Sequence, residues 1–203
     1  MKMFFSLLIA FAILILPILS VAQQSGEGKP INPTAIEFNN KAVVLMTQDE
    51  CDSALFYFDK AIEADSNYMP PHSSKSKIYV INGQYDLALN ETESAIKIKP
   101  DQAEAWAFAG VIIEFKGDTL KAKDYFKKSI EIFDARISNP DMSNFIFANK
   151  FNRAISLILL GNEKEGKNEL NKIKEDFSEF SMIIDEYLKL SRQEIVQTIL
   201  GTK

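Results

Sequence analysis

The sequence predicts an all-α protein built from stacked helix–turn–helix units, and three observations lead to this fold class. Small and aromatic residues recur at one fixed spacing of 34 residues along the chain. Between them, apolar residues recur three or four positions apart, which is the spacing of one face of an α-helix. Gly83 and Gly117 stand where two of the helix pairs would turn, and glycine adopts the left-handed conformation of such turns at little cost.

The fixed period is visible in columns of residues that lie 34 positions apart. Ala54, Ala88 and Ala122 form a column of small residues that lets two antiparallel helices approach closely. Further columns at this spacing are Phe38, His72 and Trp106; Ala42, Ser76 and Gly110; Leu45, Tyr79 and Ile113; Asp49, Gly83 and Gly117; Phe58, Thr92 and Phe126; and Ala61, Ala95 and Ser129. Because one unit alone cannot bury its apolar face, the copies must stack on one another.

In these columns the chain resembles the tetratricopeptide repeat (TPR) family, whose unit is a helix–turn–helix of about 34 residues. The third copy resembles it most, through Ala103, Trp106, Gly110, Gly117, Asp118, Ala122 and Phe126. The resemblance covers residues 32–174 and implies a right-handed α-solenoid of about three to four TPR units. We expect units at residues 32–67, 68–101 and 102–136, and a degenerate unit at 143–174 after an insertion. Lys41 and Lys75 depart from the family pattern, which usually has leucine there.

The first 22 residues have the pattern of an export signal. Lys2 precedes an apolar run over residues 7–19, and the small residues Ser20 and Ala22 end it, so that cleavage would leave Gln23 as the new N-terminus. The alternative is an uncleaved membrane anchor over residues 3–19, although a bilayer span needs about 20 residues. We therefore expect a periplasmic or secreted protein, with residues 23–31 as a flexible lead-in.

The start of each helix and the C-terminal segment have recognisable signals. Three pairs have the spacing of a capping box, which satisfies free backbone amides at a helix start: Thr34 with Glu37, Asp101 with Glu104, and Ser191 with Glu194. Residues 177–190 have an amphipathic helical pattern, and a second helix would follow Ser191. We expect residues 175–203 to form a pair of capping helices at the end of the repeats.

Composition excludes several classes of function. The net charge of -5 argues against binding to nucleic acid, which requires a basic face. With a single cysteine, Cys51, the chain forms no internal disulfide and no cysteine zinc cluster. No phosphate-binding glycine loop or metal-binding histidine pair is present, so we predict no cofactor, no metal site, no catalytic residue and no enzyme. His72 and Cys51 are interpreted as packing residues; the alternative is a small hydrolase or a non-catalytic subunit of an enzyme complex.

The resemblance also implies where a partner would bind. In TPR proteins the first helices of successive units line a concave groove that holds a peptide or helix of another protein. The residues expected to line the groove here are Asn39, Asn40, Val43, Ser74, Lys77, Phe108, Val111 and Phe115. Val43, Glu104 and Phe108 stand where some members carry a carboxylate-binding clamp, so we predict no such clamp. The resemblance thus predicts an exported scaffold or adaptor for an unidentified protein or peptide, with membrane contact only if the N-terminal segment is uncleaved.

The expected groove changes from polar near Asn39 to apolar near Phe108 and Phe115. Two interpretations of the apolar stretch stay open. Either the C-terminal helices, or residues 145–147 of the insertion, cover it as ordinary core, or it is an open trough for an amphipathic partner helix.

Overall fold

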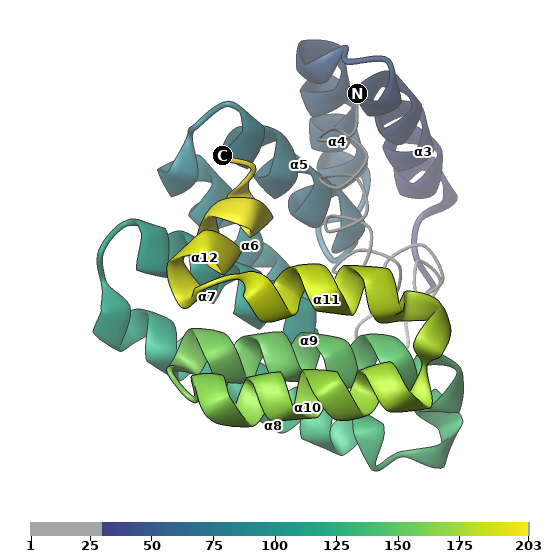
Figure 1. The fold of residues 1–203 in the computed structure, drawn as a ribbon. Coiled ribbons are helices and arrows are strands. Elements are labelled where there is room, and N and C mark those ends of the chain that lie inside the picture. The colour runs from purple at the N-terminus through teal and green to yellow at the C-terminus, as the bar shows by residue number, and fades with distance from the viewer. Residues whose placement is uncertain (1–29, 203) are drawn as a thin grey trace. The chain divides into compact units, whose positions relative to one another are not determined.

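The computed structural model describes residues 30–202, and every regular element among them is a helix (Figure 1). The chain divides into two compact units, whose described parts are residues 30–101 and 102–202; we call them the N-terminal and C-terminal units. The export signal predicted at residues 1–22, and most of the predicted lead-in, lie outside the described residues. Within residues 30–202, no helix combines the length and the apolar character that a membrane span requires.

The N-terminal unit consists of two helical hairpins. The first pairs α3 (Pro33–Thr47) with α4 (Cys51–Ala64), and the second pairs α5 (Pro70–Ile81) with α6 (Tyr85–Ile98). Ala42, Ala54 and Phe58 are completely buried in the first hairpin. The hairpins fall within the ranges 32–67 and 68–101 that the 34-residue period predicts.

The turns inside the hairpins use the left-handed backbone conformation expected from the sequence. Gly83 has a φ of 70° and Gly117 a φ of 94°. Asp49 occupies the same column in the first hairpin and has a φ of 61°, a conformation that only a few non-glycine residues adopt. This column therefore holds one backbone conformation in three successive hairpins, with or without glycine.

Two of the three expected capping boxes are wrong. The first helix is capped by Asn32, whose side chain accepts a hydrogen bond from the Thr34 amide at 3.0 Å. Pro33 explains the shift, because its fixed φ and missing N–H suit the first helical position. Glu104 does not cap α7, which begins after Gln102 without a side-chain cap. The third box, Ser191 with Glu194, is confirmed.

The C-terminal unit begins with two helical hairpins that are separated by the expected insertion. α7 (Ala103–Phe115) and α8 (Thr119–Ile137) form a hairpin, and α9 (Ile146–Leu160) and α10 (Glu163–Asp176) form the next. The insertion is a short 3-10 helix, η2 (Pro140–Phe145), which follows the extended end of α8.

Two further helices complete the C-terminal unit. The stretch expected to be one helix over residues 177–190 is split into the 3-10 turn η3 (Ser178–Phe180) and α11 (Ser181–Lys189). α11 runs beside α10, and α12 (Arg192–Leu200) packs on α7 and α9 (Figure 1). The Phe147 and Phe180 rings stack with centroids 3.8 Å apart, which holds η3 against α9.

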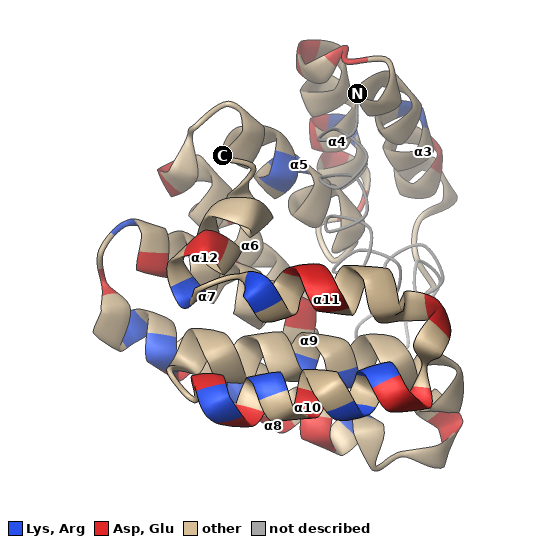
Figure 2. Cartoon of the chain, viewed as in Figure 1, with Lys and Arg blue, Asp and Glu red and all other residues tan. Residues whose placement is uncertain are grey.

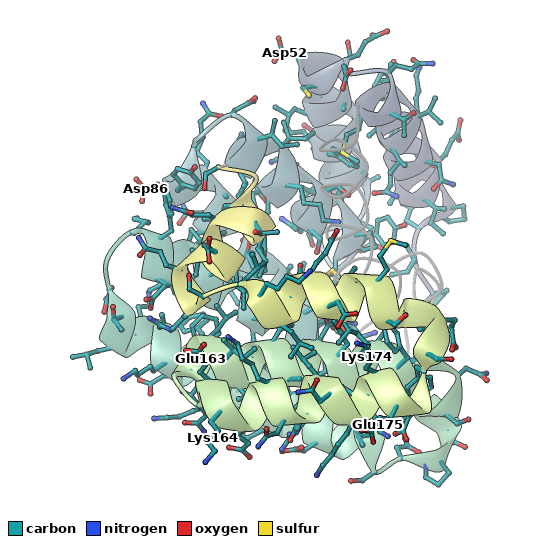
Figure 3. The ribbon with its side chains drawn as sticks, in the orientation of Figure 1. Asp52, Asp86, Glu163, Lys164, Lys174 and Glu175 are labelled. Atoms are coloured by element: carbon teal, nitrogen blue, oxygen red, sulfur yellow. The ribbon has the colours of Figure 1, made fainter. Side chains whose placement is uncertain are left out.

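Charged residues follow α10 along its length (Figure 2). Glu163 and Lys164 lie near its start, and Lys174 and Glu175 near its end (Figure 3). Lys174 pairs with Asp185 of α11 through Nζ and Oδ1, which lie 2.6 Å apart. α10 therefore presents a solvated charged face, while Gly166, Leu170 and Ile173 form its buried face.

Gly166 is the position of closest approach between α9 and α10. A Cβ atom added there would lie 2.6 Å from the Ala154 carbonyl oxygen and 2.6 Å from Ile158 Cγ1. Alanine favours a helix over glycine by about 1 kcal/mol, but this clash involves backbone that cannot move cheaply.

We expect Gly166→Ala to lower the free energy of unfolding by about 1–2 kcal/mol, measured by urea denaturation. Lys164→Ala, an exposed change on the same helix, is the control and leaves stability unchanged. A Gly166→Ala variant as stable as wild type would contradict the close approach.

Candidate partner-binding site

The first helices of the N-terminal unit place the polar residues of the predicted groove. Asn39 lies on α3 and is only 7% exposed, and its Oδ1 accepts no hydrogen bond from any residue in the described part of the chain. Asn40 is exposed and Val43 is half-buried on the same helix. Ser74 and Lys77 are half-buried on α5, which contacts α3. The unit thus holds a buried acceptor without a donor.

Lys77 is a second polar group without a partner on these helices. Its side chain makes no hydrogen bond or ion pair within residues 30–202, and burial lowers its pKa to about 8. An ammonium group loses hydration when it is buried, and no opposite charge compensates Lys77 for that loss.

The neighbouring Lys75 is fully compensated, in contrast. Its Nζ lies 2.7 Å from Asp59 Oδ1 on α4 and 2.6 Å from Glu91 Oε1 on α6. The other Glu91 oxygen lies 2.7 Å from His72 Nδ1. Burial raises the pKa of Glu91, but hydrogen bonds from His72 and Lys75 outweigh that effect and hold it below its usual value. Lys75 is therefore part of the core of this unit, whereas Lys77 is not.

The sequence indicates that His72 is a half-buried packing residue, and the structure adds a polar contact to that interpretation. It is half-buried, but its ring contacts the Glu91 carboxylate. Cys51 is a half-buried free thiol at the start of α4. Within residues 30–202, no three acidic, histidine or cysteine side chains are grouped closely enough to hold a metal ion.

The apolar part of the predicted groove lies on α7 and is covered within the C-terminal unit. Phe108 and Val111 line a small cavity together with Ile199 of α12, and Val111 is only 1% exposed. Of the two open interpretations, cover by a C-terminal helix is the one the structure shows for these two residues. Phe115, in the last turn of α7, remains 41% exposed.

Glu104 has a partner of its own in the C-terminal unit. Arg136 Nη1 donates to both Glu104 oxygens, at 2.8 and 2.9 Å. This ion pair holds the Glu104 carboxylate against α8. This pair could not be predicted from the sequence, because the partners are 32 residues apart.

The position of α12 is the feature of the site that the sequence did not reveal. Arg192 at its start reaches Glu114 of α7, with Nη1 and Oε1 2.6 Å apart. The only signals available in the sequence were the capping box at Ser191 and the apolar pattern after it. These predict a helix but not the face on which it packs.

The pKa of Lys77 predicts a particular pH dependence. Its pKa is lower in the folded protein, about 8, than the ordinary value of 10.5, so the unfolded chain binds more protons between these values. The resulting cost to stability is fully present below pH 8 and disappears as the pH rises toward 10.5.

We expect Lys77→Met to unfold at higher urea concentration than wild type at pH 7, by on the order of 2 kcal/mol, and to lose this advantage by pH 10.5. Lys97→Met, an exposed change on α6, is the control at both pH values. An advantage that does not change with pH would show that Lys77 is not desolvated.

Comparison with known protein families identifies one helical repeat in the C-terminal unit. Residues 103–135 match the family model of the tetratricopeptide repeat. Over 102 residues, or 49% of this chain, the sequence is 28% identical to Heat shock protein STI1 of Saccharomyces cerevisiae. The match spans 17% of the length of that relative.

Solved structures extend the likeness from one repeat to the fold. YrrB, described as a TPR protein with an unusual peptide-binding site, has a TM-score of 0.51 at 16% identity, over 94% of this chain and 92% of its own. The C-terminal part of a TPR repeat-containing protein from Cytophaga hutchinsonii has a TM-score of 0.51 at 15% identity, over 83% of this chain and 69% of its own. The predicted all-α fold class is thereby confirmed: residues 103–135 form a tetratricopeptide repeat, and the chain has the fold of TPR proteins.

Proposed function

We propose that this chain is an exported, non-catalytic scaffold that holds a peptide of a partner protein on α3 and α5 of the N-terminal unit. The observation that carries the proposal is the presence of two unsatisfied polar groups on these helices. Asn39 Oδ1 is buried without a donor, and Lys77 is half-buried without an anion, as judged within residues 30–202.

Unsatisfied buried polar groups are costly, and few native proteins keep them without a reason. An extended peptide supplies what both groups need: its backbone N–H donates to an amide oxygen, and an acidic side chain or carbonyl oxygen accepts from a lysine. The half-buried Ser74 adds a hydroxyl that can donate or accept. The chemistry therefore favours an extended peptide with one acidic residue.

The comparisons support a protein-binding role without assigning a partner. YrrB, which shares the fold, is described as having a peptide-binding site. The groove residues predicted on α7 favour the N-terminal unit by contrast, because α12 covers Val111 and leaves only Phe115 well exposed.

We expect a displayed library of random peptides, selected on residues 23–203, to yield acidic peptides that bind in an extended form. Lys77→Met removes the cation and should weaken a selected peptide by roughly tenfold, as measured by fluorescence anisotropy. Asn39→Leu removes the acceptor and should weaken it as well.

Lys97→Met, which changes an exposed lysine of α6, should bind like wild type. Circular dichroism and melting curves show whether each variant is folded. Peptides that bind Lys77→Met as tightly as wild type, while that variant remains folded, would refute the proposed site.

Export is the second part of the proposal and rests on residues 1–22. The apolar run of residues 7–19 and the small residues that end it suit recognition and cleavage by a signal peptidase.

Expressed at full length in a bacterium with two membranes, the protein should be recovered from the periplasm with Gln23 as its first residue. N-terminal sequencing and fractionation measure this directly. Ala22→Leu, which places a large residue at the cleavage site, should leave the full-length chain on the membrane. Recovery of wild type in the membrane with an intact N-terminus would instead support the tethered alternative.

A further inference from the structure

α12 lies across α7 and α9 inside the C-terminal unit (Figure 1). Its apolar residues are buried there: Ile195, Val196, Ile199 and Leu200 are 0–5% exposed. The first helices of TPR-type hairpins, α7 and α9, are the helices on which a partner would be expected. α12 therefore sits where a partner helix would sit, as an amphipathic helix of this same chain.

The polar anchor of α12 is incomplete. Arg192 Nε donates to the Leu159 carbonyl oxygen at 2.7 Å, and Nη1 pairs with Glu114 Oε1 at 2.6 Å. Arginine can bind a carboxylate through two parallel hydrogen bonds, but here Glu114 Oε2 and Arg192 Nη2 are both buried without a partner among residues 30–202. One carboxylate oxygen and one guanidinium nitrogen of this ion pair are therefore available for a further hydrogen bond.

The apolar contact is incomplete as well. A cavity of about 10 Å³ remains under α12, which is close to the smallest space that holds a water molecule. Its lining includes Phe108, Val111, Asn152, Ile155, Leu159 and Ile199. Asn152 is 4% exposed, and its Nδ2 donates to no acceptor in the described part of the chain. A buried amide without an acceptor beside Ile199 indicates that α12 does not supply everything this surface can bind.

We propose that the surface of α7 and α9 under α12, the α12 seat, is a second binding site that takes an amphipathic helix of a partner protein in exchange for α12. The chemistry of the seat defines that helix. It carries a basic residue in its first turn for Glu114, and apolar residues three, four and eight positions later. An acceptor side chain at the position of Ile199 would complete the bonding of Asn152.

α12 can be exchanged because it packs on two helices, α7 and α9, and is joined to α11 by a short linker. It is 9 residues long and joins α11 through Leu190 and Ser191, both in extended conformation. Helices of that length are not stable alone, so most of the stability of α12 comes from the seat. The contacts within the two hairpins and between α10 and α11 do not involve α12. This site uses other residues than the proposed peptide site of the N-terminal unit and does not depend on it.

A rescue experiment on the full chain tests the exchange. The probe is a fluorescent synthetic peptide of residues 190–202. Arg192→Met in the full chain weakens the attachment of α12 and leaves Glu114 without its partner. We expect this variant to bind the peptide roughly tenfold more tightly than wild type, because the peptide restores the arginine.

Two controls isolate the seat. The same peptide carrying Arg192→Met should not bind tightly to either protein, and a full chain carrying Gln193→Ala, an exposed position of α12, should bind like wild type. Equal binding of the native peptide to wild type and to the Arg192→Met chain would overturn the proposal.

Hydrogen exchange of the wild-type chain provides a second test that needs no variant. Amides of α12 should exchange well before those of α9, since release of α12 is a local opening. Exchange of α12 only together with α9 would show that it is an inseparable part of the fold and would overturn the proposal. So would a dimer in which α12 of a second copy fills the seat.

Discussion

The close packing of a small first-helix residue against a residue of the second helix recurs in the first three helical hairpins. A Cβ atom on Gly110 of α7 would lie 2.7 Å from the Phe126 ring of α8, so this glycine makes room for the phenylalanine. One repeat earlier the same two columns hold Ser76 and Thr92, whose hydroxyl oxygens lie 2.6 Å apart. Ala42 and Phe58 are both completely buried in the first hairpin. The contact is apolar in one hairpin and hydrogen-bonded in another, but in each case it depends on a first-helix residue small enough to admit its partner.

Charged residues inside the hairpins follow a second constraint, because a buried charge is tolerated only with a counter-charge. Lys75 stands where TPR units usually have leucine, and Asp59 and Glu91 on two other helices neutralise it. Glu104 is 5% exposed and is neutralised by Arg136. The chain thus replaces apolar contacts by ion pairs between helices. These pairs add directional contacts at a cost in desolvation, and they set Lys77 apart as a half-buried cation that has no such partner within residues 30–202.

Sequence reasoning predicted those features that depend on local geometry or on the 34-residue period. The hairpins, the turn column of Asp49, Gly83 and Gly117, and the capping box at Ser191 required only residues close in sequence or one repeat apart. It failed where a contact between residues distant in sequence determines the role of a side chain. Glu104 has the spacing of a helix cap, but its carboxylate binds Arg136 instead. It also failed where two local signals compete, since Pro33 moves the first cap to Asn32. Where α12 docks could not be predicted, because an amphipathic pattern gives a helix its buried face but not its neighbour.

The different character of the two predicted groove regions follows from the same physical chemistry. The α7 face carries Phe108 and Val111, whose exposure to water is unfavourable, so this unit gains stability from a helix of its own that covers them. The α3 and α5 face carries the exposed Asn40 and the half-buried Ser74, whose polar groups water can reach, so the pressure for a permanent apolar cover is weaker there. An apolar binding surface therefore needs a covering segment that a partner can displace. A polar binding surface can stay exposed to water until its ligand binds. The incomplete bonding of Arg192, Glu114 and Asn152 is what such a removable cover would show, since a cover that satisfied every group would compete too well with a partner.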